Sequence, residues 1–274
     1  MDNGKVTKNL IPDKIFIVPY RNREPHKMVF NLVMKQILKE TNYKIIYVHQ
    51  KDNRPFNRGA IKNIGFLYVK SEYPLHWKKI TLVFHDIDCL AYKENQFSFD
   101  TTPGVINHFF GFKHTLGGIF AIKGADFELT AGFPNIWTWG LEDNIIWERA
   151  KAVKIPIKYD EFLHAQHDTN KIVSLWHGWN RLLNPDVGLS KTHYHRDSVW
   201  SIKNLKYYEE DIDDKIKMVH VLHFDVPVSH ESKLVKDARV KNARYHRVFK
   251  SWRNPNPQNK RFNKRSGLVM NFGR

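Results

Sequence analysis

The sequence lacks the features that mark secreted and membrane proteins. Cys89 is the single cysteine among 274 residues, so an internal disulfide framework is excluded. No stretch approaches the unbroken apolar length of a membrane span, and the polar residues 1–8 are not followed by the apolar core of a signal peptide. We therefore expect a soluble, cytoplasmic protein without a transmembrane segment or membrane anchor.

Glycine-rich nucleotide-binding motifs are missing as well. The sequence contains neither the G-x-G-x-x-G turn of dinucleotide-binding folds nor a phosphate loop with its Gly-Lys-Ser/Thr ending. If the protein binds a nucleotide, other side chains must hold it.

Acidic residues are few compared with basic ones. The chain has 28 Asp and Glu against 44 Lys and Arg, a formal charge of +16, and residues 229–274 alone hold 13 Lys and Arg against 2 Asp and Glu. We divide the chain into a polar arm (1–13), a nearly balanced domain (14–228) and a basic C-terminal extension (229–274). Apolar residues at helical spacing from Leu234 to Trp252 predict a helix packed on the domain, followed by a disordered end. The other interpretation of the extension is a module that binds an anionic polymer or a membrane surface.

Hydrophobic residues make up 42% of the chain and aromatic residues 14%, which is enough for an extended core. Apolar runs at 14–20, 43–49 and 80–84 predict buried strands, and apolar residues at three–four spacing in 30–38 and 61–69 predict two amphipathic helices. This alternation indicates an α/β fold with a mostly parallel sheet covered by helices. Ligands of such sheets gather at the C-terminal ends of the strands.

The second half of the domain shows weaker patterns. Residues 164–185 are polar with little periodicity and are interpreted as a long loop. The other elements expected here are a strand at 117–122, a helix from Glu142 that buries Ile146, Ala150 and Val153, and a strand at 155–157.

Two pairs of residues have the chemistry of metal ligands. Asp86 and Asp88 stand at a strand end and could place a carboxylate on a cation that bridges a diphosphate, although a solvated turn has the same pattern. His164 and His167 could face one ligand, or they could be exposed loop histidines. Together with Asp88 they would form a mixed nitrogen and oxygen site that favours manganese over magnesium.

Three arginines follow the first two predicted strands. Arg21 and Arg23 come after the first strand, and Arg58 follows Phe56 and Asn57 after the second. Planar donor forks near an aromatic ring suit the recognition of phosphate or uracil. The alternative is surface charge at the starts of two helices.

The segment Trp137–Asp143 combines residue types found in sugar-binding sites. Tryptophan stacks on sugar rings, glycine allows close approach of the backbone, and the carboxylates of Glu142 and Asp143 can accept hydrogen bonds from hydroxyls. The alternative is a pair of core tryptophans beside acids that the helix dipole favours.

In their order along the chain, these motifs resemble those of the beta-1,4-galactosyltransferase family over roughly residues 14–228. His85 stands before the aspartate motif, as in the family member that acts on xylose. The matching motifs are Pro19–Arg23, Phe56–Arg58, Asn63–Phe66, Asp86–Asp88, Gly117–Gly118, Gly132–Asn135 and Trp139–Asp143.

The resemblance implies a GT-A-type single domain, a UDP-sugar donor, Mn²⁺ and inversion at the anomeric carbon. It assigns Asp143 as the catalytic base and makes Glu142 a second catalytic-site residue that, with Trp139, contacts the sugars. The donor-binding residues implied are Pro19, Arg21, Arg23, Phe56, Arg58, Asp86, Asp88, Thr115, Gly118 and Trp139, and the implied metal ligands are Asp88, His164 and His167.

The sequence departs from the family at three positions. His164 stands where several members have methionine, Asn144 where a further acid is usual, and Thr115 where vertebrate members have a tyrosine that crowds the sugar's C2 substituent. The donor is therefore expected to be UDP-galactose or UDP-N-acetylgalactosamine, and the acceptor a glycan or glycoprotein. The membrane anchor of the animal Golgi enzymes is not seen.

Three other classes of function remain open at this point. A nucleic-acid-binding protein would explain the basic extension but not the aspartate and tryptophan motifs. A metallohydrolase could use Asp88, His164 and His167, and an inactive relative could serve as a sugar-binding module.

Overall fold

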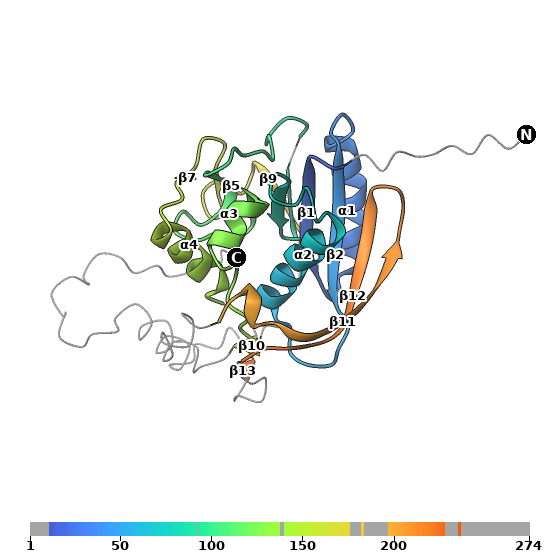
Figure 1. The fold of residues 1–274 in the computed structure, drawn as a ribbon. Helices are drawn as coiled ribbons and strands as arrows, with labels where there is room; N and C mark the ends of the chain where they lie inside the picture. The colour runs from blue at the N-terminus through green and yellow to red at the C-terminus, as the bar shows by residue number, and fades with distance from the viewer. Residues whose placement is uncertain are drawn as a thin grey trace, which may run out of the picture.

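A mixed sheet with helices on both faces forms the body of the protein (Figure 1). The computed structural model describes residues 11–91, 93–137, 140–175, 182–183, 197–227 and 235–236. The strands are β1 (Lys14–Tyr20), β2 (Tyr43–Gln50), β3 (Thr81–His85), β4 (Cys89–Ala91), β5 (Ile106–Gly111), β6 (Ile119–Lys123), β7 (Ile157–Lys158), β8 (Leu163–His164), β9 (Ile172–Ser174), β10 (Leu182–Leu183), β11 (Lys203–Asp211), β12 (Ile216–Asp225) and β13 (Val235–Lys236), and the helices are α1 (Glu24–Ile37), α2 (Arg58–Glu72), α3 (Gly124–Leu129), α4 (Glu142–Ala152) and a 3₁₀ turn (Val199–Ser201).

The main sheet has nine strands, eight of them in the order β11-β12-β2-β1-β3-β6-β5-β7, with β8 also paired to β5. Strands β12, β2, β1 and β3 run parallel, which the sequence predicted for β1, β2 and β3 but not for β12. Strand β6 then runs antiparallel to both of its neighbours, β3 and β5, and β11 runs antiparallel to β12. The α/β class is confirmed, and the sheet is mixed rather than purely parallel.

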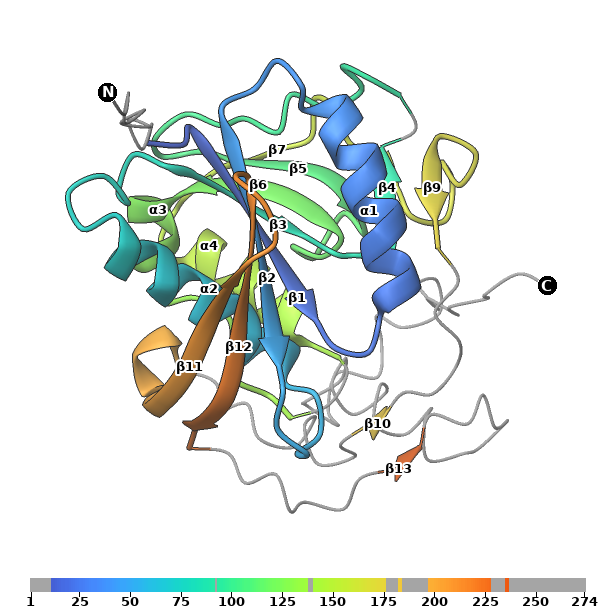
Figure 2. The same cartoon turned by 90° about the vertical axis from the view of Figure 1, so that its right-hand side faces the viewer.

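The residues of β1 alternate between two hydrophobic cores because successive side chains of a strand point to opposite faces of the sheet. Ile15 and Ile17 belong to the core beneath α2, whereas Phe16 and Val18 belong to the core beneath α1. Figure 2 shows α1 and α2 on the two faces of the sheet. The predicted helical faces therefore cover the two sides of the strands that precede them.

Helix α2 lies very close to the sheet at Gly65. A Cβ at this position would collide with a methyl group of Ile17 and lie 3.0 Å from Val48 Cγ2. Asn57 is the N-cap residue of α2, and its side chain accepts a hydrogen bond from Ala60 N at 3.0 Å. A fixed start and a close helix–sheet contact therefore position the first turns of α2 above the sheet edge.

Several expected elements differ from those observed. Val153, expected to be buried, is 43% exposed at the C-terminal end of α4. Residues 164–185, predicted to form a long loop, contain short strands. One of them is β9, which pairs with β4. Residues 235 and 236, expected in a helix, form a short strand paired with β10. Trp139 and the rest of the C-terminal extension lie outside the described residues.

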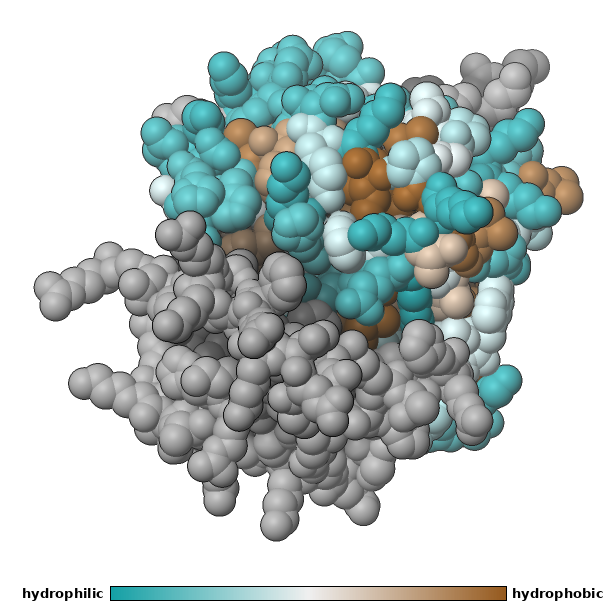
Figure 3. All heavy atoms as spheres, turned by 90° about the vertical axis from the view of Figure 1, so that its left-hand side faces the viewer, coloured by the Kyte–Doolittle hydropathy of each residue, from teal (hydrophilic) through white to brown (hydrophobic). Residues whose placement is uncertain are grey.

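Hydrophilic residues dominate the described surface on the side of α3 and α4, with small hydrophobic patches between them (Figure 3). None of the helices that the structure describes is both long enough and apolar enough to cross a membrane. The single cysteine, Cys89, is a buried free thiol, and its burial raises its pKa well above the ordinary value.

Candidate active site

Five charged side chains meet at the C-terminal edge of the parallel strands. Arg58 and Lys62 extend from the first two turns of α2, Asp86 follows β3 directly, and Glu142 and Asp143 open α4. We call these five residues the charge cluster. It joins three motifs that the sequence had singled out separately: Phe56–Arg58, the aspartate pair and the tryptophan–carboxylate segment.

Arg58 lies at the centre of the charge cluster. Its Nη1 donates to Asp143 Oδ2 at 2.7 Å and to a carboxylate oxygen of Glu142, and its Nη2 contacts both carboxylate oxygens of Asp86. Lys62 approaches from the interior, with its Nζ 3.2 Å from Asp143 Oδ1 and 3.7 Å from Asp86 Oδ1. Two cations therefore face three carboxylates.

Burial and neighbouring charges act in opposite directions on these groups. Burial alone would raise the pKa of Asp86, but the cations of Arg58 and Lys62 outweigh it and hold this pKa far below its usual range. Burial, together with the charge of Asp143, raises the pKa of Glu142. Burial would lower the pKa of Arg58, and the three carboxylates reverse this, so the guanidinium stays charged. The cluster therefore contains two carboxylic groups with opposite tendencies to ionise.

The position of Asp143 is fixed by its backbone and by a glycine opposite it. Leu141 precedes α4 with a φ of 72°, which turns the chain sharply into the helix. The carbonyl of Asp143 accepts a hydrogen bond from Leu116 N at 2.8 Å. A Cβ on Gly117 would lie 2.5 Å from Asp143 Oδ2, so only glycine leaves room for this carboxylate. The Gly-Gly motif thus has a direct structural link to the predicted base.

A buried amide network joins α2 to the turn before α4. The side chain of Asn63 donates to Phe133 O at 2.8 Å and to Asn135 Oδ1 at 2.9 Å, and it accepts from Phe133 N at 2.8 Å. Asn57 donates to Asn135 O at 3.1 Å, and Asn135 in turn donates to the carboxylate of Asp197. Three of the sequence motifs therefore hold the cluster's two helices in place.

The predicted donor-binding residues in β1 and in the loops after β1 and β2, apart from Arg58, lie outside the charge cluster. Pro19 is buried in β1, and Phe56 packs partly buried against the main core. Arg21 donates to the backbone carbonyls of Asp52 and Arg54, at 3.0 Å for Asp52, and Arg23 is the N-cap residue of α1. Their contact with a donor stays a prediction.

Thr115 and Gly118 flank the glycine beside Asp143. Thr115 is half-buried, and its hydroxyl donates to Phe112 O at 3.0 Å. The Phe112 ring in turn meets His164 edge-on, with centroids 5.5 Å apart. Gly118 has a φ of 71°, and its carbonyl accepts from Asp86 N at 2.9 Å, which connects β6 to the aspartate motif.

The structure describes only one of the two tryptophans in the predicted sugar-binding segment. Trp137 is a core residue, stacked on Phe224 at 5.3 Å with the Arg54 guanidinium 4.7 Å from its ring centre. It is therefore enclosed by protein, as the alternative interpretation of this segment held. Trp139 is outside the described residues.

The two predicted histidine ligands lie together. Their rings stack with centroids 4.4 Å apart, and His164 Nδ1 accepts a hydrogen bond from Gln166 N at 3.2 Å. Leu175 N donates to Asp88 O at 2.8 Å, so the segment that follows the histidines returns beside Asp88. Within the described ranges, however, no three His, Cys, Asp or Glu side chains are close enough to form a metal site. The donor chemistry suits Mn²⁺, and two of its three proposed ligands are adjacent.

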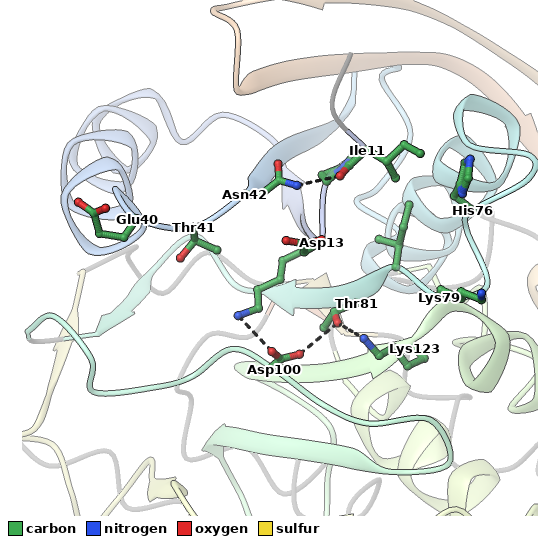
Figure 4. Close-up of a pocket in the computed structure, with 13 residues that line it drawn as sticks. Ile11, Asp13, Glu40, Thr41, Asn42, His76, Lys79, Thr81, Asp100 and Lys123 are labelled. Atoms are coloured by element: carbon green, nitrogen blue, oxygen red, sulfur yellow. Dashed lines mark hydrogen bonds and ion pairs between the residues drawn. The ribbon is translucent and has the colours of Figure 1, made fainter. Parts of the chain in front are cut away.

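A polar hollow of about 470 Å³ opens at the opposite edge of the sheet (Figure 4). It is lined at the start of β1 by Lys14, whose Nζ lies 3.4 Å from Asp100 Oδ2. Lys123 at the end of β6 donates to Thr81 Oγ1 at 2.7 Å. None of the predicted site residues lines this hollow, so the two sites are separate.

Two family models match most of the domain. The model described as the N-terminal region of glycosyl transferase group 7 matches residues 11–99, and the one described as the N-terminal domain of galactosyltransferase matches residues 106–177. The chain belongs to the beta-1,4-galactosyltransferase family.

Members of this family are similar to the chain at low sequence identity. Beta-1,4-galactosyltransferase 4 of Cricetulus griseus is 27% identical over 208 residues, which cover 67% of this chain and 58% of that protein. Beta-1,4-galactosyltransferase 6 of Rattus norvegicus is 28% identical over 146 residues, 48% of this chain and 37% of the relative. The chain thus spans only part of the length of these relatives.

Solved structures show the same GT-A fold. The catalytic domain of Drosophila beta-1,4-galactosyltransferase 7 in complex with xylobiose has a TM-score of 0.64 at 20% identity, covering 77% of this chain and 94% of that one. A mutant of that enzyme in complex with manganese, UDP-Gal and xylobiose has a TM-score of 0.61 at 21% identity. The predicted fold is confirmed.

Proposed function

We propose that this chain is an inverting glycosyltransferase that transfers galactose or N-acetylgalactosamine from a UDP-sugar to an acceptor hydroxyl. The observation that carries the proposal is the place of Asp143. Its carboxylate lies between Arg58 and Lys62 at the sheet edge where ligands of α/β folds bind. Membership of the beta-1,4-galactosyltransferase family supports the same reaction class.

In this proposal Asp143 accepts the proton of the acceptor hydroxyl as that oxygen attacks the anomeric carbon. A single in-line displacement inverts the configuration and requires no covalent nucleophile. Glu142 lies beside the base and is 3% exposed, so it can hold a sugar hydroxyl only at the inner end of the site. Arg58 would exchange part of its contact with the carboxylates for the diphosphate of the donor, which planar guanidinium groups bind well.

Manganese is the proposed metal, and Asp88, His164 and His167 would hold it. When bound, it supplies a Lewis acid that neutralises the leaving diphosphate. Two imidazoles and a carboxylate are a softer donor set than the oxygen ligands that magnesium prefers. The proposed acceptor is a glycan, by analogy with the xylobiose bound to the Drosophila enzyme.

A screen of UDP-sugars with manganese tests the proposal. UDP release is measured with and without candidate glycan acceptors, for the wild type and for Asp143→Asn. We expect acceptor-dependent release from UDP-galactose or UDP-N-acetylgalactosamine, and a loss of about a hundredfold or more in the variant because it removes only the proton acceptor. Binding of UDP, measured by calorimetry, should be retained. Undiminished turnover by Asp143→Asn would remove this residue as the base.

A further inference from the structure

Lys62 is a buried cation that the sequence motifs did not single out. Only 1% of its side chain is exposed, whereas its partners Asp86 and Asp143 keep 21% and 22% of their side chains exposed. Its Nζ lies 3.2 Å from Asp143 Oδ1, 3.7 Å from Asp86 Oδ1 and 4.7 Å from the centre of the Phe133 ring. An ammonium group removed from water is costly unless it is paired, so its carboxylate partners account for its presence there.

Lys62 and Arg58 contact Asp143 through different oxygens. Arg58 binds Oδ2 and also holds Glu142 and Asp86, so its donors are shared among three acids. Lys62 contacts Oδ1 from beneath the cluster, one helical turn later in α2. The two cations therefore fix both oxygens of the same carboxylate in the structure without a donor.

We propose that Lys62 is the positioning residue of the base. It anchors Asp143 through Oδ1, so that Oδ2 is free for the acceptor hydroxyl when Arg58 turns to the donor diphosphate. This inference rests on the proposed function, because only a transfer reaction needs Asp143 as a base. Lys62 does not touch the substrates in this arrangement, since it is enclosed below the carboxylate.

Removal of the Lys62 charge should also change the pH dependence of transfer. The charged or titratable groups that face Asp143 are Arg58 and Lys62 from α2, Asp86 after β3, the adjacent Glu142, and His108 of β5. Removing one of two neighbouring cations raises the pKa of a carboxyl group. Loss of the Lys62 ammonium should therefore move the acidic limb of the transfer rate to higher pH.

Lys62→Met tests the inference, with Lys70→Met as the matched control on the same helix. Lys70 is half-exposed and pairs with Glu128, away from the charge cluster. We expect kcat of Lys62→Met to fall by about tenfold or more, with the Kd for UDP within about twofold of the wild type, and the acidic limb of kcat/KM to move to higher pH. Lys70→Met should leave the pH profile unchanged. If Lys62→Met does not fold, as judged by circular dichroism, Lys62→Gln serves instead.

A second measurement separates this inference from the proposed function. The carboxyl carbon of Asp143 is titrated by ¹³C NMR in the wild type and in the Lys62 variant, with Asp143→Asn identifying the signal. A higher titration midpoint in the variant supports the inference when the wild type transfers sugar, whereas a wild type that transfers no sugar refutes the proposed function and the inference with it. An unchanged midpoint overturns the inference, as does a pH profile that moves equally in Lys70→Met.

Discussion

His164 and His167 stack on each other in the segment that returns beside Asp88. If they hold the proposed metal, His167→Ala removes one of three protein ligands, and water or phosphate must replace it. We expect the manganese concentration for half-maximal activity to rise about tenfold or more.

Activity is measured against manganese concentration for His167→Ala and for His223→Ala. His223 is a half-exposed histidine on β12 that pairs with Asp225, so it controls for general loss of imidazole. An identical metal dependence in the wild type and His167→Ala would exclude His167 as a ligand.

Thr115 is the residue on which donor selectivity is expected to depend. Its hydroxyl is bonded to Phe112 O, and the neighbouring Leu116 is buried in the core, so Leu116 does not refill the space beside Thr115. A tyrosine here would crowd the C2 substituent of the sugar. Thr115→Tyr should therefore shift selectivity from UDP-N-acetylgalactosamine toward UDP-galactose, by an amount equivalent to about 1–3 kcal/mol.

Competition between the two donors measures this shift directly as a ratio of products. Thr115→Ser, which keeps the hydroxyl, is the matched control and should retain the wild-type ratio. The hypothesis fails if the wild type already excludes the N-acetyl donor, or if the tyrosine leaves the ratio unchanged.

At the scale of single elements, α2 depends on its close approach to the sheet. Gly65→Ala places a methyl group against Ile17 and Val48, and overpacking of this kind costs about 1–3 kcal/mol of the free energy of unfolding. We expect a lower urea midpoint for Gly65→Ala. Ser71→Ala, at an exposed position of the same helix, should stay within about 0.5 kcal/mol of the wild type. Equal stability of the two variants would show that α2 can move away from β1 without loss.

The elements that could be predicted from the sequence are those with a buried apolar side. Strands β1 to β3 and helices α1 and α2 carry long apolar patterns, and their observed positions agree with the expected ones. Strand β11 was not predicted, because nearly all of it is exposed and its sequence KNLKYYEED has no apolar alternation. Strand β12, IKMVHVLHFD, does carry an apolar pattern, which the sequence analysis missed. Strands β8 and β9 are too short to carry a pattern.

The candidate site could be predicted only in part, because one of its contacts depends on residues that are distant in sequence. Sequence motifs indicated Arg58, Asp86, Glu142 and Asp143, and the structure places these four in contact. Lys62 was not indicated, since a lysine inside an amphipathic helix is usually interpreted as solvent-facing. Its burial depends on Phe133 and Asp143, which are distant in sequence and reach α2 only in the folded chain.

At the scale of the whole molecule, two buried histidines and one half-buried histidine make the fold sensitive to acid. Burial lowers the pKa of His49, His85 and His108 to about 4, below the ordinary value of about 6.5. Below pH 6.5 the unfolded chain binds protons that the folded chain does not, so stability is lost as pH falls from about 6.5 to about 4. Above pH 6.5 these groups should have no effect on stability.

Urea unfolding at a series of pH values measures this dependence. His49→Gln should reduce the slope between pH 6.5 and 4, because glutamine can still meet the ring of His220 but cannot be protonated. A slope that is equal in the wild type and the variant would show that His49 gains its proton as easily in the folded state.

The reversal of strand direction between β3 and β6 divides the domain into two halves, and the charge cluster lies across this seam. Arg58, Lys62 and Asp86 come from the half matched by the first family model, whereas Glu142 and Asp143 come from the half matched by the second. The first half alone carries two cations beside one acid, and the second carries adjacent acids with no cation of the cluster. Mutual neutralisation therefore occurs only when the halves dock. A site built across this seam cannot form before the two halves dock, so recovery of the proposed transfer activity during refolding should report when they have joined.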